Sequence, residues 1–148
     1  MGLIISDSDV NTKAEGEMYI DGNTNVTTIS AVDTWTDVAD FVAGKLNQVT
    51  FASNKLTVLE TGTYDVEWNL SSQAAVANKT FEFCVTVETT QQDKTVIARR
   101  YSSADVGASS GGGYIDLNAG DEVFLQVQNL TDATNITVTQ ANLRLHKI

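Results

Sequence analysis

The sequence predicts an all-β protein, either a sandwich of two antiparallel sheets or a barrel. Apolar and polar residues alternate with a period of two along most of the 148-residue chain, and this pattern is typical of strands with one buried face. Turn-forming sequences such as Asp21-Gly22, Ser53-Asn54 and Ala119-Gly120-Asp121 separate these runs. Long helical patterns are rare, so about ten short strands would enclose a single core.

Residues 64–70 and 81–88 are the clearest predicted strands. A shift of one residue in either strand would move its aromatic side chains into solvent, so the pairing register is well specified. Two sheets packed face to face would bury these two apolar faces together with that of a third strand, residues 123–127. The predicted core comprises Tyr64, Val66, Trp68, Phe81, Phe83, Val123, Leu125 and Val127.

Shorter strands are predicted along the rest of the chain. They cover residues 16–21, 25–32, 49–52, 55–60, 94–101 and 113–117. A last strand runs from Asn135 to the C-terminus. Its apolar residues change phase between Val138 and Ala141, which predicts a β-bulge near Thr139–Gln140.

Two segments depart from the alternating pattern. Residues 37–47 carry apolar side chains at helix-like spacings, so this segment is either a short helix or an irregular loop. Residues 102–114 contain three consecutive glycines and no apolar anchor, which predicts a mobile surface loop. Glycine repeats also bind phosphates, but such a site needs a helix N-terminus and usually a nearby lysine, and the sequence offers neither here.

Phe124 raises a specific question about the strand at 123–127. It stands among the outward-facing residues of a strand whose other face is apolar. An aromatic side chain there is either a contact with another subunit or one of the single exposed apolar residues that proteins tolerate. Tyr19, Trp35 and Tyr114 are the other aromatic residues that the core pattern leaves unassigned.

Composition narrows the possible partners. A net charge of −10 with nine Lys and Arg residues along the chain argues against nucleic-acid binding, which needs clustered basic residues. The longest apolar runs have the length of a strand, so neither a transmembrane segment nor a membrane partner is predicted. The N-terminal sequence MGLIISDSDVNTK lacks the basic region and long apolar stretch of a secretory signal.

Residues that usually carry catalysis are sparse. His146 is the only histidine and Cys84 the only cysteine, and nothing in the sequence brings either together with a partner as nucleophile and base. A lone cysteine also excludes an internal disulfide framework and a multi-cysteine zinc site. Asp65 and Glu67 share a strand face, which alternating charge on a solvated strand explains equally well. The sequence therefore predicts a protein that is not an enzyme and holds no cofactor or metal.

One alternative for calcium remains open at the N-terminus. Asp7, Asp9 and Asn11 have the spacing that begins an EF-hand loop. The match fails further along, because Thr12 stands where the loop needs glycine and Met18 stands where it needs glutamate. A weak calcium site from the two aspartates is the alternative to an exposed acidic terminus.

Four motifs follow one another from residue 62 to the C-terminus: GTYDVEWNLSS, FEFCVTVE, IDLNAGDEVFLQVQN and ITVTQANLRLHKI. Their order resembles the tumour-necrosis-factor-like jelly roll, which is shared with complement globular heads, over residues 55–148. The resemblance implies a two-sheet antiparallel jelly-roll sandwich and a homotrimer in which one sheet of each protomer packs around the three-fold axis. The matching positions are Gly62, Tyr64, Leu117, Gly120, Asp121, Val123, Leu125 and Val127.

The N-terminal third carries a second resemblance. GEMYIDGNTNVTTISAVDTWTDV and VTFASNKLTVLETGTY are similar to small virion proteins of tailed bacteriophages that contain this jelly roll. One departure is ETTQQDKTV, which replaces the asparagine–glycine pair often found at that place. The resemblance implies a capsid decoration (cement) protein, a homotrimer bound to the major capsid protein on the outer surface of the phage head. The alternative is the head domain of a tail fibre or spike that binds a host receptor.

These expectations define an N-terminal arm, residues 1–14, and a single jelly-roll domain, residues 15–148. The arm would become ordered on the capsid. Candidate subunit or capsid contacts are Leu3, Ile4, Ile5, Tyr19, Trp35, Tyr114 and Phe124. A carbohydrate-binding or hydrolytic jelly roll is a third hypothesis; it would need aromatic side chains paired with carboxylates in one groove.

Overall fold

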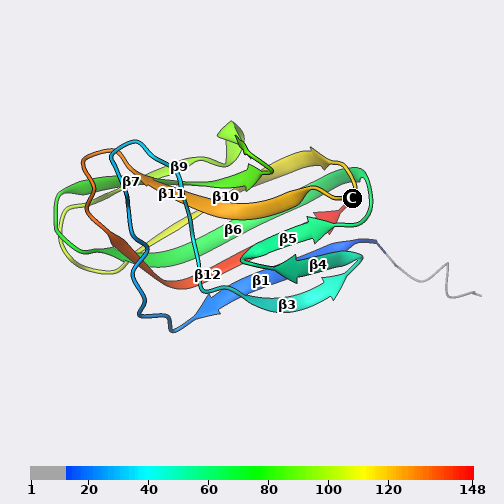
Figure 1. The fold of residues 1–148 in the computed structure, drawn as a ribbon, viewed down its shortest axis with the longest axis horizontal. Coiled ribbons are helices and arrows are strands. Elements are labelled where there is room, and N and C mark those ends of the chain that lie inside the picture. The colour runs from blue at the N-terminus through cyan, green and yellow to red at the C-terminus, as the bar shows by residue number, and fades with distance from the viewer. Residues whose placement is uncertain (1–12) are drawn as a thin grey trace, which may run out of the picture.

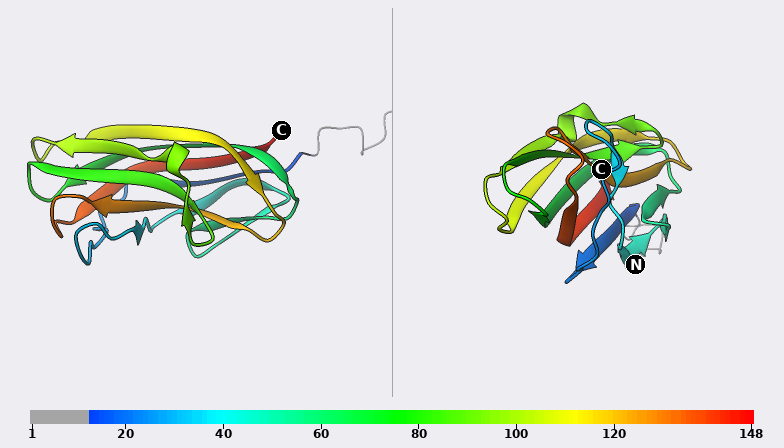
Figure 2. Two further views of the ribbon diagram at one scale, coloured as in Figure 1. Left: turned by 90° about the horizontal axis from the view of Figure 1, so that it is seen from above. Right: turned by 60° about the vertical axis from the view of Figure 1, so that its left-hand side comes forward.

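The chain folds into two antiparallel β-sheets that pack face to face (Figures 1 and 2). The computed structural model describes residues 13–148. The first sheet has five strands in the order β10 (Gly107–Leu117), β6 (Gly62–Ala74), β12 (Ile136–Lys147), β1 (Glu15–Asp21) and β3 (Val42–Asn47). This five-stranded sheet forms the rear layer of Figure 1.

The second sheet has seven strands. Its main path runs β4 (Val49–Ala52), β5 (Lys55–Val58), β11 (Glu122–Asn129), β7 (Lys79–Val87) and β8 (Thr90–Gln91). Two further strands lie off this path: β2 (Thr36–Asp37) pairs with β11, and β9 (Ile97–Tyr101) pairs with β7. A 3-10 turn, η2 (Asp93–Thr95), precedes β9. The predicted two-sheet antiparallel sandwich is therefore confirmed.

The predicted core residues lie between the two sheets. Tyr64, Val66 and Trp68 project from β6 toward the facing strands β7 and β11, and all of them are buried. The Trp68 and Phe83 rings meet across the sandwich with their centroids 6.0 Å apart. Burial of each such side chain contributes about 1.5–3 kcal/mol to folding. The other predicted core residues are buried as well: Phe81, Val123, Leu125 and Val127.

Two local predictions are confirmed by the backbone. The register of β12 against β6 shifts between Val138 and Gln140, which places a bulge where the apolar phase changes. Gly120 adopts a φ of +97° in the turn between β10 and β11, a conformation that favours glycine. The Asp121 carboxylate closes the same turn by accepting a hydrogen bond of 2.8 Å from the Asn118 N–H.

Residues 37–47 form no helix, so that alternative is wrong. The segment holds the end of β2, a short connection and all of β3. Its backbone pairs with both sheets: the Val38 N–H donates to the Leu125 carbonyl at 3.0 Å, and Val42 is paired with Tyr19. These ladder contacts outweigh the helix-like spacing, since helical propensity is a weak preference that tertiary context overrides.

The prediction of a mobile loop at 102–114 is wrong for most of its length. β10 starts at Gly107 and pairs with β6 through all three consecutive glycines. A Cβ atom on Gly111 would lie 2.9 Å from Trp68 Nε1 and 3.0 Å from the Thr95 carbonyl oxygen. The glycines therefore permit a close approach of strands, and only residues 102–106 remain outside a strand.

The predicted strands at 25–32 and 94–101 are only partly present. The first contains one isolated bridge, Thr27 to Ile136. There the Ile29 N–H donates to the Asn135 side chain at 2.8 Å, so a side chain replaces the neighbouring strand as its partner. The second begins as η2, whose Thr95 carbonyl accepts the Trp68 indole N–H at 3.1 Å.

The Phe124 ring is buried, so the expectation of an exposed aromatic is wrong. Phe124 points away from the sandwich interior, yet its side chain is only 4% exposed. The Lys55 ammonium lies 4.5 Å above the ring centroid, and β5 and β7 flank the residue on either side. A cation over an aromatic face is favourable, and the long lysine stem covers apolar surface. Within residues 13–148, no helix is long and apolar enough to cross a membrane.

Candidate functional site

Two of the predicted contact residues lie on the outer face of the five-stranded sheet. Tyr19 on β1 is 37% exposed, and Tyr114 on β10 is 60% exposed. Cross-strand pairing places both on this face: Tyr19 is opposite Asn142, Asn142 is opposite Asn69, and Tyr114 is opposite Asp65. Trp35 is half-buried just before β2. Leu3, Ile4 and Ile5 lie outside the described residues.

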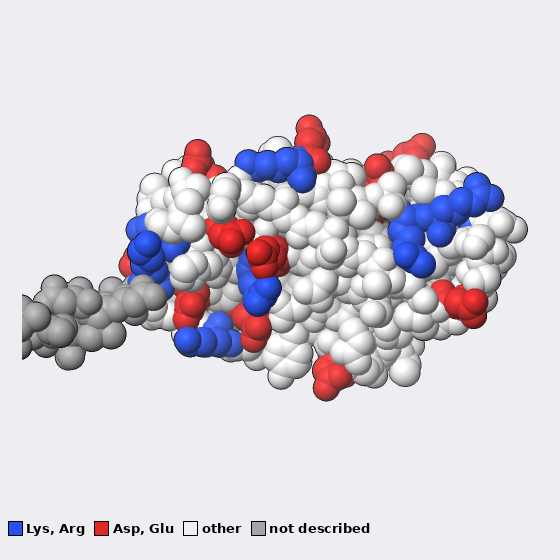
Figure 3. Space-filling view, turned by 180° about the vertical axis from the view of Figure 1, so that it is seen from behind, with Lys and Arg blue, Asp and Glu red and all other residues white. Residues whose placement is uncertain are grey.

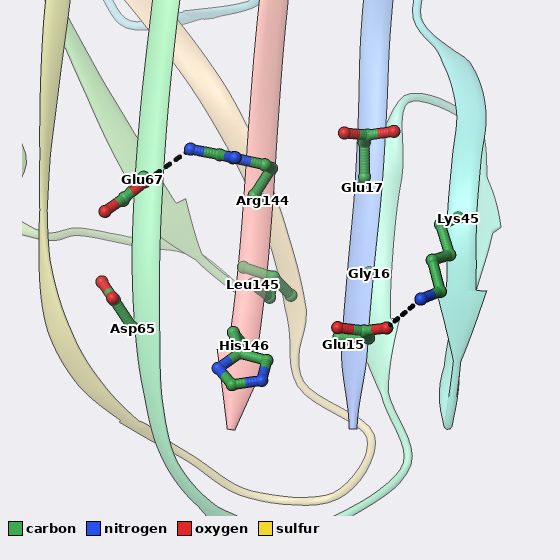
Figure 4. Close-up of a pocket in the computed structure, with 9 residues that line it drawn as sticks. All are labelled: Glu15, Gly16, Glu17, Lys45, Asp65, Glu67, Arg144, Leu145 and His146. Carbon is green, nitrogen blue, oxygen red and sulfur yellow. Dashed lines mark hydrogen bonds and ion pairs between the residues drawn. The ribbon is translucent and has the colours of Figure 1, made fainter. Parts of the chain in front are cut away.

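Charged side chains form two rows across the same face (Figure 4). In the first row, Arg144 on β12 stands between Glu17 on β1 and Glu67 on β6. Arg144 Nη2 lies 2.6 Å from Glu67 Oε2, whereas Glu17 accepts a hydrogen bond of 3.2 Å from the Asn142 amide. Opposite charges on neighbouring strands stabilise their pairing by a fraction of a kcal/mol, about 0.2–1.

In the second row a histidine takes the central position between two carboxylates. His146 on β12 stands between Glu15 on β1 and Asp65 on β6. Glu15 also pairs with Lys45 of β3, with Nζ and Oε1 2.8 Å apart. This hydrogen bond lowers the pKa of Glu15, and the positive charges of Lys45 and His146 lower it further, against the opposing effect of desolvation. Glu15 in turn raises the pKa of Lys45.

The two rows line a hollow of about 290 Å³. Its walls carry four carboxylates and two permanent cations, which leaves a net charge of −2 when His146 is neutral. Figure 3 shows acidic and basic side chains gathered on the half of this face nearest the N-terminal end, beside a broad uncharged area. The hollow is therefore a small depression with a net negative charge, on a surface that carries charges of both signs. Its lining residues are Glu15, Gly16, Glu17, Lys45, Asp65, Glu67, Arg144, Leu145 and His146.

The glycine run of β10 adds a second hollow beside the first. This depression of about 450 Å³ shares Asp65 and Glu67 with the charged hollow and extends over Ser110 to Gly113. Because three consecutive residues have no side chain, the surface between β6 and Tyr114 is left open. The sequence signal for this feature is the GGG triplet, whose strand conformation was not predicted.

The arrangement of side chains does not resemble a catalytic centre. Cys84 is buried in β7, on the other sheet from His146, and burial raises the pKa of its thiol to about 11. A nucleophilic cysteine needs a lowered pKa. Among residues 13–148, no three His, Cys, Asp or Glu side chains are placed to hold a metal ion. The face instead presents ion pairs and two exposed tyrosines.

Comparisons with known proteins identify the fold. No protein-family model matches the sequence, and no curated protein sequence does. Solved structures do match: murine APRIL at pH 5.0 superposes with a TM-score of 0.68 at 13% identity, covering 92% of this chain and 99% of that one. Eiger TNF from S. frugiperda superposes with a TM-score of 0.61 at 15% identity, covering 93% and 94%.

These likenesses establish the fold without establishing an activity, because both identities are low. They agree with the resemblance of residues 55–148 to the tumour-necrosis-factor-like jelly roll and extend it across more than nine tenths of the chain. Neither neighbour is a bacteriophage protein, so the second resemblance rests on the N-terminal sequence alone. The chain has a tumour-necrosis-factor-like jelly-roll fold.

Proposed function

We propose that this protein is a structural component of a bacteriophage particle, a homotrimeric decoration protein on the outer surface of the capsid. The resemblance of its N-terminal third to small phage virion proteins motivates the proposal. The observation that carries it is the outer face of the five-stranded sheet, where charged rows and exposed Tyr19 and Tyr114 offer binding contacts. The described residues around this hollow offer contacts but no catalytic arrangement.

A trimer requires a particular kind of contact surface. In a closed ring of three, each interface joins two different patches of the chain, so a single self-complementary patch is not enough. The outer face supplies two unlike patches: the charged rows across β1, β12 and β6, and Tyr114 beside the glycine run of β10. Stable oligomers commonly bury on the order of 2,000 Å², so such a trimer would use a large part of this outer face.

A trimer would bind a capsid more tightly than a single chain, because its three copies bind together. Three linked copies dissociate from a repetitive shell far more slowly than one copy, because each released contact is held close to its site by the other two. Binding energy spread over several capsid subunits would oppose their separation under the pressure of packaged DNA. The net charge of −10 suits a location outside the shell, away from the phosphates of the genome.

The proposal is tested by sedimenting purified protein with phage heads that lack it. We expect saturable binding in multiples of three chains, and an increase in the temperature at which the heads release DNA. An R144E variant, which places a third carboxylate in its row, should bind less because it weakens the trimer. An E82K variant changes a charge on the outer face of the other sheet and serves as its control.

Copy number separates this role from the fibre alternative. A decoration protein would be present in a number of copies comparable with that of the capsid subunits themselves, whereas a fibre or spike head would be present in few. Quantitative mass spectrometry of purified particles measures this ratio. A handful of copies, or no binding of the trimer to bare heads, would contradict the decoration role.

A further inference from the structure

The outer edge of β3 is not paired with any other strand that the structure describes. β3 closes one end of the five-stranded sheet and pairs on one side with β1 (Figure 1). No strand within residues 13–148 pairs with its opposite side. An exposed strand edge presents a row of N–H and C=O groups to which an additional strand can bind.

The opposite edge of the same sheet is protected. On β10, the Arg99 guanidinium donates to the Ala108 carbonyl at 3.0 Å, and the Lys94 ammonium donates to the Tyr114 carbonyl. Basic side chains placed in this way block the approach of another strand. The lysine of β3 does not act similarly, because Lys45 reaches toward β1 and pairs with Glu15. The two edges therefore differ in how open they are.

Apolar side chains lie exposed on both faces of the β3 edge. Val42, which is 49% exposed, is paired with Tyr19 on the outer face of the sheet. Leu46, which is 38% exposed, is paired with Gly16, whose neighbour across the sandwich is Val49. A strand added along β3 would cover both of these side chains at once. Such a strand needs apolar residues on both of its own faces.

The N-terminal segment of the chain has that composition. Leu3, Ile4 and Ile5 are three consecutive apolar residues, the pattern of a strand buried on both faces, since alternate side chains point to opposite sides. Residues 2–6 would extend for about 17 Å, close to the length of the six-residue β3.

We propose that residues 2–6 of one copy bind as an antiparallel strand along β3 of a second copy. For an antiparallel strand, pairing within one chain is disfavoured by where the segment starts. The Asn47 side chain donates to the Lys13 carbonyl at 3.1 Å, so the chain leaves the fold at the C-terminal end of β3. An antiparallel segment would end at the other extremity of β3, and residues 7–12 would have to return almost fully extended, over about 20 Å.

Cysteine cross-linking between two single variants tests the exchange. I4C protein is mixed with L46C protein, and disulfides are formed under mild oxidation. The native Cys84 is buried and does not interfere. We expect a linked species of two chains that contains one copy of each variant. The control replaces L46C by V76C, an apolar position outside β3 that is more exposed than Leu46, and should give no such species above background.

A double variant decides between exchange and self-pairing. If I4C and L46C link only when both are in one chain, the strand belongs to the same copy and the proposal is wrong. No link in either format also overturns it. Hydrogen exchange provides an independent readout: deletion of residues 1–12 should accelerate exchange of the β3 amides by about tenfold or more.

The inference is independent of the proposed function. Suppose that a chain without residues 1–12 still forms trimers and still binds phage heads, while the full chain shows no cross-link. This result would contradict the strand exchange and leave the decoration role in place. Conversely, a clear cross-link in a protein that does not bind phage heads would support the strand exchange and contradict the decoration role.

Discussion

Gly111 shows how one missing side chain sets the position of a whole strand. Its backbone packs against Trp68 and Ile97, and a Cβ atom there would approach both to 2.9 Å. At the same place, the Trp68 indole N–H donates a hydrogen bond to the Thr95 carbonyl. The closeness of β10, β9 and η2 at this edge therefore depends on a residue that contributes no side chain at all.

A G111A substitution should destabilise the fold. The added methyl group must displace Trp68 or open the edge of the sandwich, and overpacking of this kind costs about 1–3 kcal/mol. G113A is the matched control, since its Cβ would meet the flexible Lys94 side chain at 3.1 Å instead of the core. Urea unfolding of the two variants measures the difference. Equal midpoints would contradict the close-packing explanation.

Cys84 predicts a loss of stability at alkaline pH. Burial raises the pKa of its thiol from 9.0 to about 11, so the unfolded chain ionises first. The stability that comes from keeping this thiol neutral is fully present below pH 9 and is lost as pH rises toward 11. Burial also raises the pKa values of Tyr64 and Tyr101, which adds to the fall above pH 10.

The measurement is the free energy of unfolding of the wild type and of C84A between pH 8 and pH 11. We expect the wild type to lose more stability over this range than the variant does. The native thiol should also remain unreactive toward Ellman's reagent at pH 8, because the reagent needs an accessible thiolate. Rapid reaction of the folded protein would show that the thiol is exposed.

At the scale of elements, the turn between β11 and β12 is organised by one buried polar side chain. Asn129 is fully buried. Its carbonyl oxygen accepts hydrogen bonds from the N–H groups of Thr131 and Asp132 at 2.8 and 3.1 Å, and its amide donates to the Thr134 carbonyl at 2.9 Å. The Asp132 carboxylate pairs with Lys79, and this hydrogen bond, together with hydrogen bonds from Thr134, lowers the pKa of Asp132 to about 2.

An N129L substitution should cost about 1–3 kcal/mol or more, because it leaves these buried backbone groups without partners. Q128A removes the neighbouring side chain, whose amide contacts Glu82 on the outer face, and should have a much smaller effect. Thermal unfolding followed by circular dichroism compares the two. A similar loss in both variants would mean that the turn does not depend on Asn129.

The sequence predicts elements well where each strand has one apolar face. The strands containing Tyr64 and Phe81 follow directly from alternation, and the β12 bulge follows from its change of phase at Thr139. Prediction fails where tertiary contacts decide the backbone. Residues 37–47 pair with both sheets. Residues 107–113 form a strand because they pair with β6, and Gly111 permits the close approach of Trp68 there.

The candidate site was predictable only in part. Tyr19 and Tyr114 stand out as aromatic residues that the core pattern does not use. The charged rows do not stand out, because Glu15, His146 and Asp65 are far apart in the sequence and meet only through the order β1, β12, β6. Alternation gives the face on which a side chain lies, but it does not give the neighbouring strand.

At the scale of the whole molecule, the outer face of the five-stranded sheet differs from a typical apolar interface. Its hollow is lined by alternating charges, so an assembly built on it should depend on salt and pH. Exposed ion pairs are screened, with a Debye length of about 8 Å at physiological ionic strength. Trimers held partly by such contacts should dissociate more readily in concentrated salt than at low ionic strength.

A charge-reversal pair tests this dependence. R144E should weaken the trimer, and the double variant R144E with E67R should restore part of the lost affinity, because Arg144 and Glu67 form an ion pair at 2.6 Å. Sedimentation velocity over a range of salt concentrations reports the fraction of trimer. Equal dissociation of the two variants would mean that this ion pair plays no part in assembly.

The mass of the full-length chain in solution tests the central claim most directly. Sedimentation equilibrium of the purified protein should give about 48 kDa, the mass of three 15.9 kDa chains. A mass of 15.9 kDa at every concentration examined would contradict the account, because a monomer leaves the outer face of the five-stranded sheet without the partner that the proposed function requires.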